Sequence, residues 1–210
     1  MKIHLYLAAL FCVFHFGFAQ EKANDVVFLE NGVQKKIAEA SGKWNRVGEF
    51  LEAEGAGSKL IAGQQIGPGD FSVRAELALE KMAKSAAVFK MGGSFFGFAG
   101  AHGKIFLTGA FFDDAKGTPI GEPTDFMTNL TPFVLEVSRT GADLKISIDG
   151  KLVHERKVHE KAIGEIGFMP GRAKMRVKNF QATGNLAYHF EIELDPPYRV
   201  KEVKGVTKNR

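Results

Sequence analysis

Residues 133–180 constrain the fold of this chain more than any other segment. Alternation of apolar with polar residues is typical of a strand with one buried and one exposed face. Asp149-Gly150 lies between two alternating runs, and Asp-Gly is a strong signal for a type I′ hairpin turn. The segment therefore predicts antiparallel strands joined by short turns. The apolar positions of the two clearest runs are Phe133, Leu135, Val137, Leu144, Ile146 and Ile148.

Short runs of strand composition fill most of the chain between residues 44 and 184. We expect strands at residues 59–66, 71–77, 85–91, 94–98 and 104–112. A turn at residues 67–70 separates the first two, and a long loop at 113–131 follows the last. Residues 33–40 are expected to form a short helix or an irregular lead-in. Many short strands with little helix predict an all-β fold of two packed antiparallel sheets.

The first nineteen residues have the pattern of a secretory signal peptide. Lys2 is followed by an apolar run at residues 3–18, and Gly17 and Ala19 are small residues before a cleavage site at Gln20. A membrane anchor would need about 20 apolar residues, and this run is shorter and contains two histidines. We therefore expect an exported protein, secreted or periplasmic, with no membrane span.

Removal of residues 1–19 also removes Cys12, the only cysteine. The mature chain would then have no disulfide and would depend on a large core. The charge is uneven as well, because residues 199–210 hold five basic residues and one acidic residue. The remaining mature chain is close to neutral, so we expect no nucleic-acid partner.

Three motifs, taken in order, resemble one superfamily. They are the strand Gly69-Asp70-Phe71-Ser72-Val73-Arg74-Ala75-Glu76-Leu77, the hairpin from Phe133 to the Ile148-Asp149-Gly150-Lys151 turn, and the closing pair Gly164-Glu165-Ile166-Gly167-Phe168 and Met175-Arg176-Val177-Lys178-Asn179-Phe180.

Together these motifs resemble the laminin-G-like jelly rolls of bacterial secreted carbohydrate-active proteins, in the concanavalin A-like lectin/glucanase superfamily. The resemblance implies a two-sheet antiparallel jelly-roll sandwich with little helix. It covers a domain at residues 44–186, after the signal peptide (1–19) and a lead-in (20–43). Residues 187–210 would form an edge strand or a linker with a basic tail.

The resemblance implies a glycan or polysaccharide as partner, and a place before a glycosidase or sialidase-type module. The favoured hypothesis is a non-catalytic glycan-binding or accessory module. The alternatives are a glycoside hydrolase or lyase with an atypical carboxylate pair, and a structural adhesion module. The Glu-x-Asp-x-x-Glu run of the superfamily's glucanases is absent from this sequence.

Glycoside hydrolysis needs two carboxylates, and Glu76 and Glu136 are the weak candidates on the polar faces of expected strands. We expect both to be solvated and paired with cationic residues across strands. For ligand binding, Arg74 and Glu76 are two residues apart on one strand and so share a face. They are the candidates for hydrogen bonds to sugar hydroxyls, together with three polar residues of turns: His102, Asp113 and Asp114. The alternative is that Arg74 and Glu76 form a surface ion pair and that the turns are only polar loops.

No cofactor is expected, and Ca²⁺ bound by loop oxygens is the one metal that remains open. The aromatic residues are unbalanced, with 19 Phe against 3 Tyr and 1 Trp. Phenylalanine on alternating strand positions is core by default. The phenylalanines between residues 95 and 112 are too many for one face, so some must lie on the opposite face or in a loop.

Overall fold

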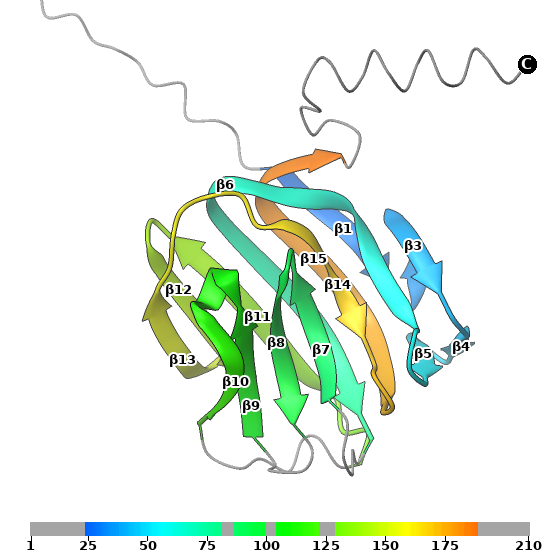
Figure 1. Ribbon diagram of the computed structural model, residues 1–210. Coiled ribbons are helices and arrows are strands. Elements are labelled where there is room, and N and C mark those ends of the chain that lie inside the picture. Colours follow the sequence, from blue (N-terminus) through cyan, green and yellow to red (C-terminus); the bar gives the residue numbers. More distant parts are fainter. Residues whose placement is uncertain (1–23, 81–85, 100–103, 122–128, 189–210) are drawn as a thin grey trace, which may run out of the picture.

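The computed structural model describes residues 24–80, 86–99, 104–121 and 129–188. Within these residues the chain forms fifteen strands and one 3-10 helix, which confirms the all-β prediction. One continuous hydrogen-bonded sheet folds over itself into two facing layers (Figure 1). The strands are β1 (Asn24–Glu30), β2 (Val33–Gln34), β3 (Ile37–Ser41), β4 (Trp44–Val47), β5 (Phe50–Glu54), β6 (Lys59–Leu79), β7 (Ala86–Met91), β8 (Ser94–Ala99), β9 (Lys104–Gly109), β10 (Asp114–Ile120), β11 (Phe133–Thr140), β12 (Asp143–Ile148), β13 (Lys151–Lys157), β14 (Gly164–Met169) and β15 (Lys174–Tyr188), and the helix is η1 (Ala110–Phe112).

The two layers are called here the front sheet and the back sheet. The front sheet contains β10, β9, β8, β7, β14 and the first half of β6, with β3 on the other side of β6. The back sheet contains β13, β12, β11, the second half of β6, β15 and β1. All these pairs are antiparallel, as a jelly-roll sandwich requires.

Strand β6 belongs to both sheets. Its first half pairs with β14, and residues 71–77 pair with β11. We predicted a turn at residues 67–70 between two separate strands, and this was wrong: these residues bend a single strand. Gly69 has a φ of +91°, which a side chain rarely tolerates, and the buried Arg139 side chain binds its carbonyl oxygen.

The predicted core is confirmed. The ten apolar residues expected between the sheets are all buried in one cluster, while Arg74 and Lys145 are exposed. The strand register is therefore the expected one, since a slip of one residue would reverse these faces. Each large apolar side chain contributes about 1.5–3 kcal/mol by its burial. The ten residues are Phe71, Val73, Leu77, Phe133, Leu135, Val137, Leu144, Ile146, Ile148 and Val177.

Two segments are more regular than we expected from the sequence. Residues 20–43 were expected to be a lead-in, but β1 pairs with β15 and β3 pairs with β6. Residues 113–131 were expected to be a loop, but β10 pairs with β9. β10 contains Pro119 and Gly117, which weaken the strand signal, and a proline is tolerated there because β10 ends the strand order of the front sheet.

The expected signal peptide and basic tail lie outside the described residues. Ala187 and Tyr188 continue β15 and pair with β6. No helix among the described residues is long and apolar enough to cross a membrane.

Candidate functional site

The outer face of the back sheet is covered by ion pairs. Arg74 and Glu76 share this face, as predicted. Arg74 Nε donates to Glu136 at 3.1 Å, while Glu76 lies 3.6 Å from Lys178 Nζ and accepts a hydrogen bond from Asn179 at 3.1 Å. Both candidate carboxylates are thus paired with cations across strands, as we expected.

The two aspartates of the predicted site lie on the front sheet instead. Asp113 is exposed directly after η1, and Asp114 begins β10. In the strand order, β9, β8, β7 and β14 separate β10 from β6, which carries Arg74 and Glu76. The structure does not bring these two pairs together, and His102 lies outside the described residues.

The Asp114 carboxylate binds main-chain N–H groups of its own strand. Its oxygens accept hydrogen bonds from the main-chain N–H groups of Lys116, Gly117 and Thr118 at 2.9, 3.0 and 3.1 Å. The Thr118 side chain and these N–H groups hold the pKa of Asp114 below its ordinary value. In the part of the chain that the structure describes, no three His, Cys, Asp or Glu side chains form a group able to hold a metal ion.

An Asp114→Ala variant should therefore lose stability at neutral pH. A carboxylate with a lowered pKa stabilises the fold above its unfolded-state pKa, and this contribution disappears as the pH falls through the folded-state pKa. We expect the variant to unfold at a lower temperature than the wild type at pH 7, with a difference that shrinks toward pH 3. Thermal unfolding at both values tests this, and a pH-independent difference would contradict it.

The outer face of the front sheet has a different character. Phe89, Phe96 and Leu107 are in the core, so the residues that alternate with them face outward. Cross-strand pairs and one ion pair connect eight of the outward-facing residues into a continuous surface, which we call the platform. The platform consists of Val88, Lys90, Phe95, Gly97, Phe106, Thr108, Glu165 and Gly167.

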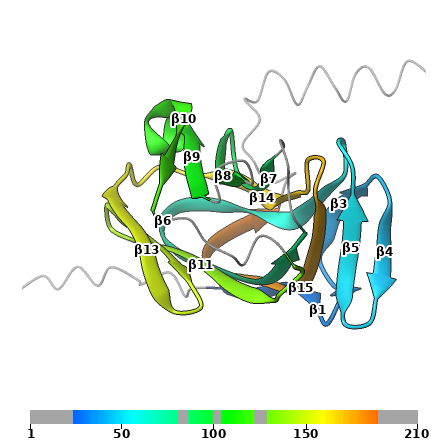
Figure 2. The same cartoon turned by 90° about the horizontal axis from the view of Figure 1, so that it is seen from below.

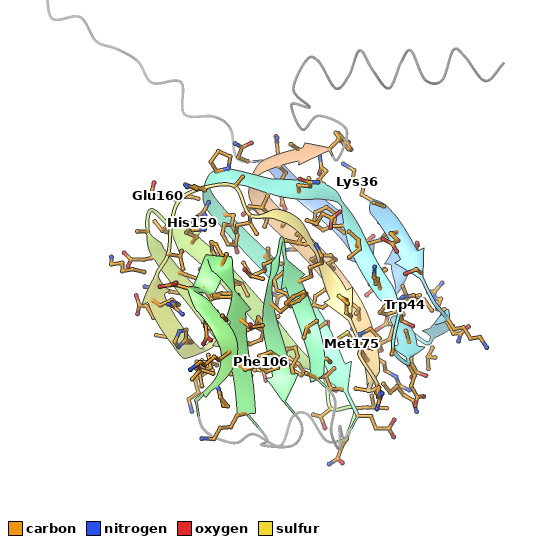
Figure 3. The ribbon with its side chains drawn as sticks, in the orientation of Figure 1. Lys36, Trp44, Phe106, His159, Glu160 and Met175 are labelled. Atoms are coloured by element: carbon orange, nitrogen blue, oxygen red, sulfur yellow. The ribbon has the colours of Figure 1, made fainter. Side chains whose placement is uncertain are left out.

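The Phe106 ring folds down over the neighbouring strand of the platform. Phe106 pairs with Gly97, and a Cβ atom on Gly97 would lie only 2.0 Å from Phe106 Cζ. The half-buried ring therefore occupies the space left by the missing side chain and lies along the sheet near the lower end of β9 (Figure 3). This confirms that some of the phenylalanines between residues 95 and 112 lie opposite the core.

A charged pair lies beside the second aromatic ring of the platform. Lys90 Nζ donates to Glu165 Oε2 at 2.7 Å, and Lys90 pairs across strands with Phe95, which pairs with Thr108. The platform thus offers two half-buried rings next to an ammonium, a carboxylate and a hydroxyl. Such a surface suits a ligand with one apolar face and hydrogen-bonding groups at its edge.

The platform is raised at one side. Figure 2 shows β9 and β10 standing above the level of β7 and β14. Phe106 and Thr108, which lie on β9, are therefore on the raised side of the platform.

A Gly97→Ala variant should displace the Phe106 ring without unfolding the domain. The clash involves the end of a side chain that can rotate away, and alanine is favoured over glycine within a strand by about 0.5–1 kcal/mol. We expect a change in unfolding free energy within about 1 kcal/mol and new NMR shifts for the Phe106 ring protons. At Gly93 an added Cβ atom meets nothing within 4 Å, so Gly93→Ala is the matched control. Unchanged Phe106 ring shifts in Gly97→Ala would contradict the placement of this ring.

One buried polar residue was missed by the sequence analysis. Arg139 is 1% exposed, and its guanidinium donates to the main-chain oxygens of Gly69, His159 and Lys161. It also lies 5.1 Å from the centre of the Phe71 ring. Its burial lowers its pKa, although an arginine side chain stays protonated in proteins. Arg139 thus joins the bend of β6 to the connection between β13 and β14.

Trp44, the only tryptophan of the sequence, packs against the core. Its indole N–H donates to the Lys59 carbonyl oxygen at 2.9 Å, and its side chain is half-buried at the β4–β5 edge (Figure 3).

No protein-family model and no curated protein sequence matches this chain. Solved structures do match. A sialidase from Trypanosoma rangeli superposes with a TM-score of 0.56 at 11% identity, over 74% of this chain and 30% of the sialidase chain. This chain therefore shares the fold of the part of the sialidase that it matches. Alginate lyase AlgAT5 of polysaccharide lyase family 7 superposes with a TM-score of 0.51 at 10% identity, over 78% of this chain and 94% of that chain.

At these identities the likeness establishes the jelly-roll sandwich and nothing finer. The match spans less than a third of the sialidase chain, but nearly all of the alginate lyase.

Proposed function

We propose that this chain is an exported, non-catalytic glycan-binding domain of the concanavalin A-like kind, and that its ligand lies on the platform. The observation that carries the proposal is the Phe106 ring, which lies along the sheet over Gly97. A pyranose ring has an apolar face of C–H groups and a rim of hydroxyls. That shape complements a flat aromatic ring with polar groups beside it.

The fold relatives support a carbohydrate as ligand. The sialidase was solved with sialic acid, and the other relative is named as an alginate lyase. Because one fold supports many activities, this support is an analogy, and the platform chemistry provides the independent argument.

The carboxylates favour binding over catalysis. Hydrolysis of a glycosidic bond uses two carboxyl groups on either side of that bond. The eight platform residues include one carboxylate, Glu165, which is bound to Lys90. Glu76 and Glu136, the catalytic candidates from the sequence, are paired with cations on the opposite sheet.

The signal-peptide pattern of residues 1–19 supports export, and the small share of the sialidase that matches fits an accessory role beside a catalytic module. A sialidase or glycosidase encoded next to this chain would support that role.

A glycan array with the purified mature chain, followed by an assay for released reducing ends, tests the proposed function. We expect saturable binding to a subset of glycans and no release of reducing ends or unsaturated products from the bound glycan. No binding to any polysaccharide or glycan would contradict the binding role. Turnover that disappears in Glu76→Gln or Glu136→Gln would instead establish the catalytic alternative.

A further inference from the structure

A small cavity lies at one end of the sandwich, beside the β7–β8 turn that follows the Lys90–Phe95 pair of the platform. Its volume is about 160 Å³, and its walls come from the β7–β8 turn, from η1 and from the connection between β13 and β14. In Figure 3, His159 lies on that connection and is higher in the view than Phe106. The residues that the argument uses are Met91, Gly93, Ser94, Phe111, His159 and Ile163.

The main chain on the His159 side of the cavity makes four hydrogen bonds, two with the Arg139 side chain and two with the β6 backbone. Arg139 Nη1 donates to the carbonyl oxygens of His159 and Lys161 at 3.0 and 2.9 Å. The Glu160 carbonyl oxygen accepts from Gly69 N at 3.1 Å, and Ile163 N donates to the β6 backbone at 2.9 Å. A connection with four such bonds keeps the His159 backbone in one position.

The opposite wall is fixed as well. The Ser94 hydroxyl oxygen accepts a hydrogen bond from the Phe111 N–H at 2.9 Å, and the Phe111 ring meets the His159 ring edge to face, with centroids 5.2 Å apart. Gly93 and His159, which both line the cavity, are exposed, and a Cβ atom on Gly93 would meet nothing within 4 Å. The cavity is therefore a formed hollow that is open to solvent beside these two residues.

The lining determines what the cavity can hold. Met91, Phe111 and Ile163 are apolar, while the His159 imidazole and the Ser94 hydroxyl supply the polar side-chain atoms. A serine hydroxyl that accepts one hydrogen bond still carries a donor, and an imidazole can donate or accept. A sugar ring buried here would leave most of its hydroxyls unpaired, which is costly.

We propose that this cavity binds the acetyl group of an N-acetylated sugar. The methyl group would lie against Met91, Phe111 and Ile163, and the amide would bond to His159 and Ser94. A cavity of about 150 Å³ holds a benzene molecule, so an acetamido group and one edge of its sugar ring fit the space. The proposal rests on the proposed function for the ligand class, but it concerns a separate site.

NMR titrations of the mature chain with N-acetylglucosamine and with glucose test the proposal. We expect saturable shift changes of the Gly93, Phe111 and Ile163 amides with N-acetylglucosamine, and at least tenfold weaker binding of glucose. A His159→Phe variant keeps a ring in the wall but removes its hydrogen bonds, and should weaken binding about tenfold. A Gly93→Leu variant places a side chain at the entrance and should also weaken binding. Lys145→Ala, on the outer face of the back sheet, is the control and should bind as the wild type does.

Two outcomes would overturn the proposal: equal responses to the two sugars, or no response at these amides. The glycan array separates this failure from failure of the proposed function. If the array detects a glycan that His159→Phe still binds but the cavity amides do not respond to N-acetylglucosamine, the platform proposal stands and the cavity proposal fails.

Discussion

Replacing Phe106 with alanine is expected to weaken glycan binding by about 10- to 150-fold. The ring lies along the platform over Gly97, and covering one large aromatic side chain is worth about 1.5–3 kcal/mol. The side chain is half-buried and lies opposite the core, so the variant should still fold. Isothermal calorimetry with the best glycan from the array measures the effect.

Leu152→Ala is the matched control for this prediction. Leu152 is also a large apolar residue, 50% exposed, but it lies on β13 of the back sheet. We expect its variant to bind with wild-type affinity. Equal affinity of Phe106→Ala and the wild type would exclude the platform as the binding surface.

Replacing Arg139 with alanine is expected to lower the free energy of unfolding by about 2–4 kcal/mol. The change removes every donor that the guanidinium supplies to the carbonyl oxygens of Gly69, His159 and Lys161, and it leaves a void beside Phe71. Buried polar groups without partners are costly, as is a cavity in a packed interior. Urea denaturation followed by circular dichroism measures the loss.

Two further variants separate the causes of this loss. Arg139→Met restores volume without donors, so it should recover the packing part only. Arg74→Ala breaks an exposed pair with Glu136 and should cost less than about 1 kcal/mol. A loss below 1 kcal/mol for Arg139→Ala would show that the connection between β13 and β14 does not depend on this side chain.

The core residues could be predicted from the sequence because the alternation of apolar and polar residues along a strand indicates directly which side chains are buried. Phe133, Leu135 and Val137 point inward as predicted, and so do the apolar positions predicted for the core on the partner strand β6. The same alternation extends to Arg139, at the next inward position. The sequence analysis did not use that signal, since alternation indicates which face of a strand a residue lies on and not which carbonyl oxygens a buried guanidinium can reach.

The platform was less accessible to sequence reasoning. The surplus of phenylalanines showed that some must face away from the core, but not which ones. That choice depends on the register of each strand, and the resting place of Phe106 depends on Gly97 from the next strand. Arg74, Glu76, Asp113 and Asp114 were grouped as one site because sequence patterns do not report which sheet a strand joins.

The most direct test of the binding surface is an NMR titration of the isotope-labelled mature chain with a glycan identified on the array. Binding at the platform predicts the largest amide shift changes at Val88, Lys90, Phe95, Gly97, Phe106 and Thr108. Shift changes concentrated instead at Arg74, Glu76 and Glu136 would contradict the platform and place the ligand on the back sheet.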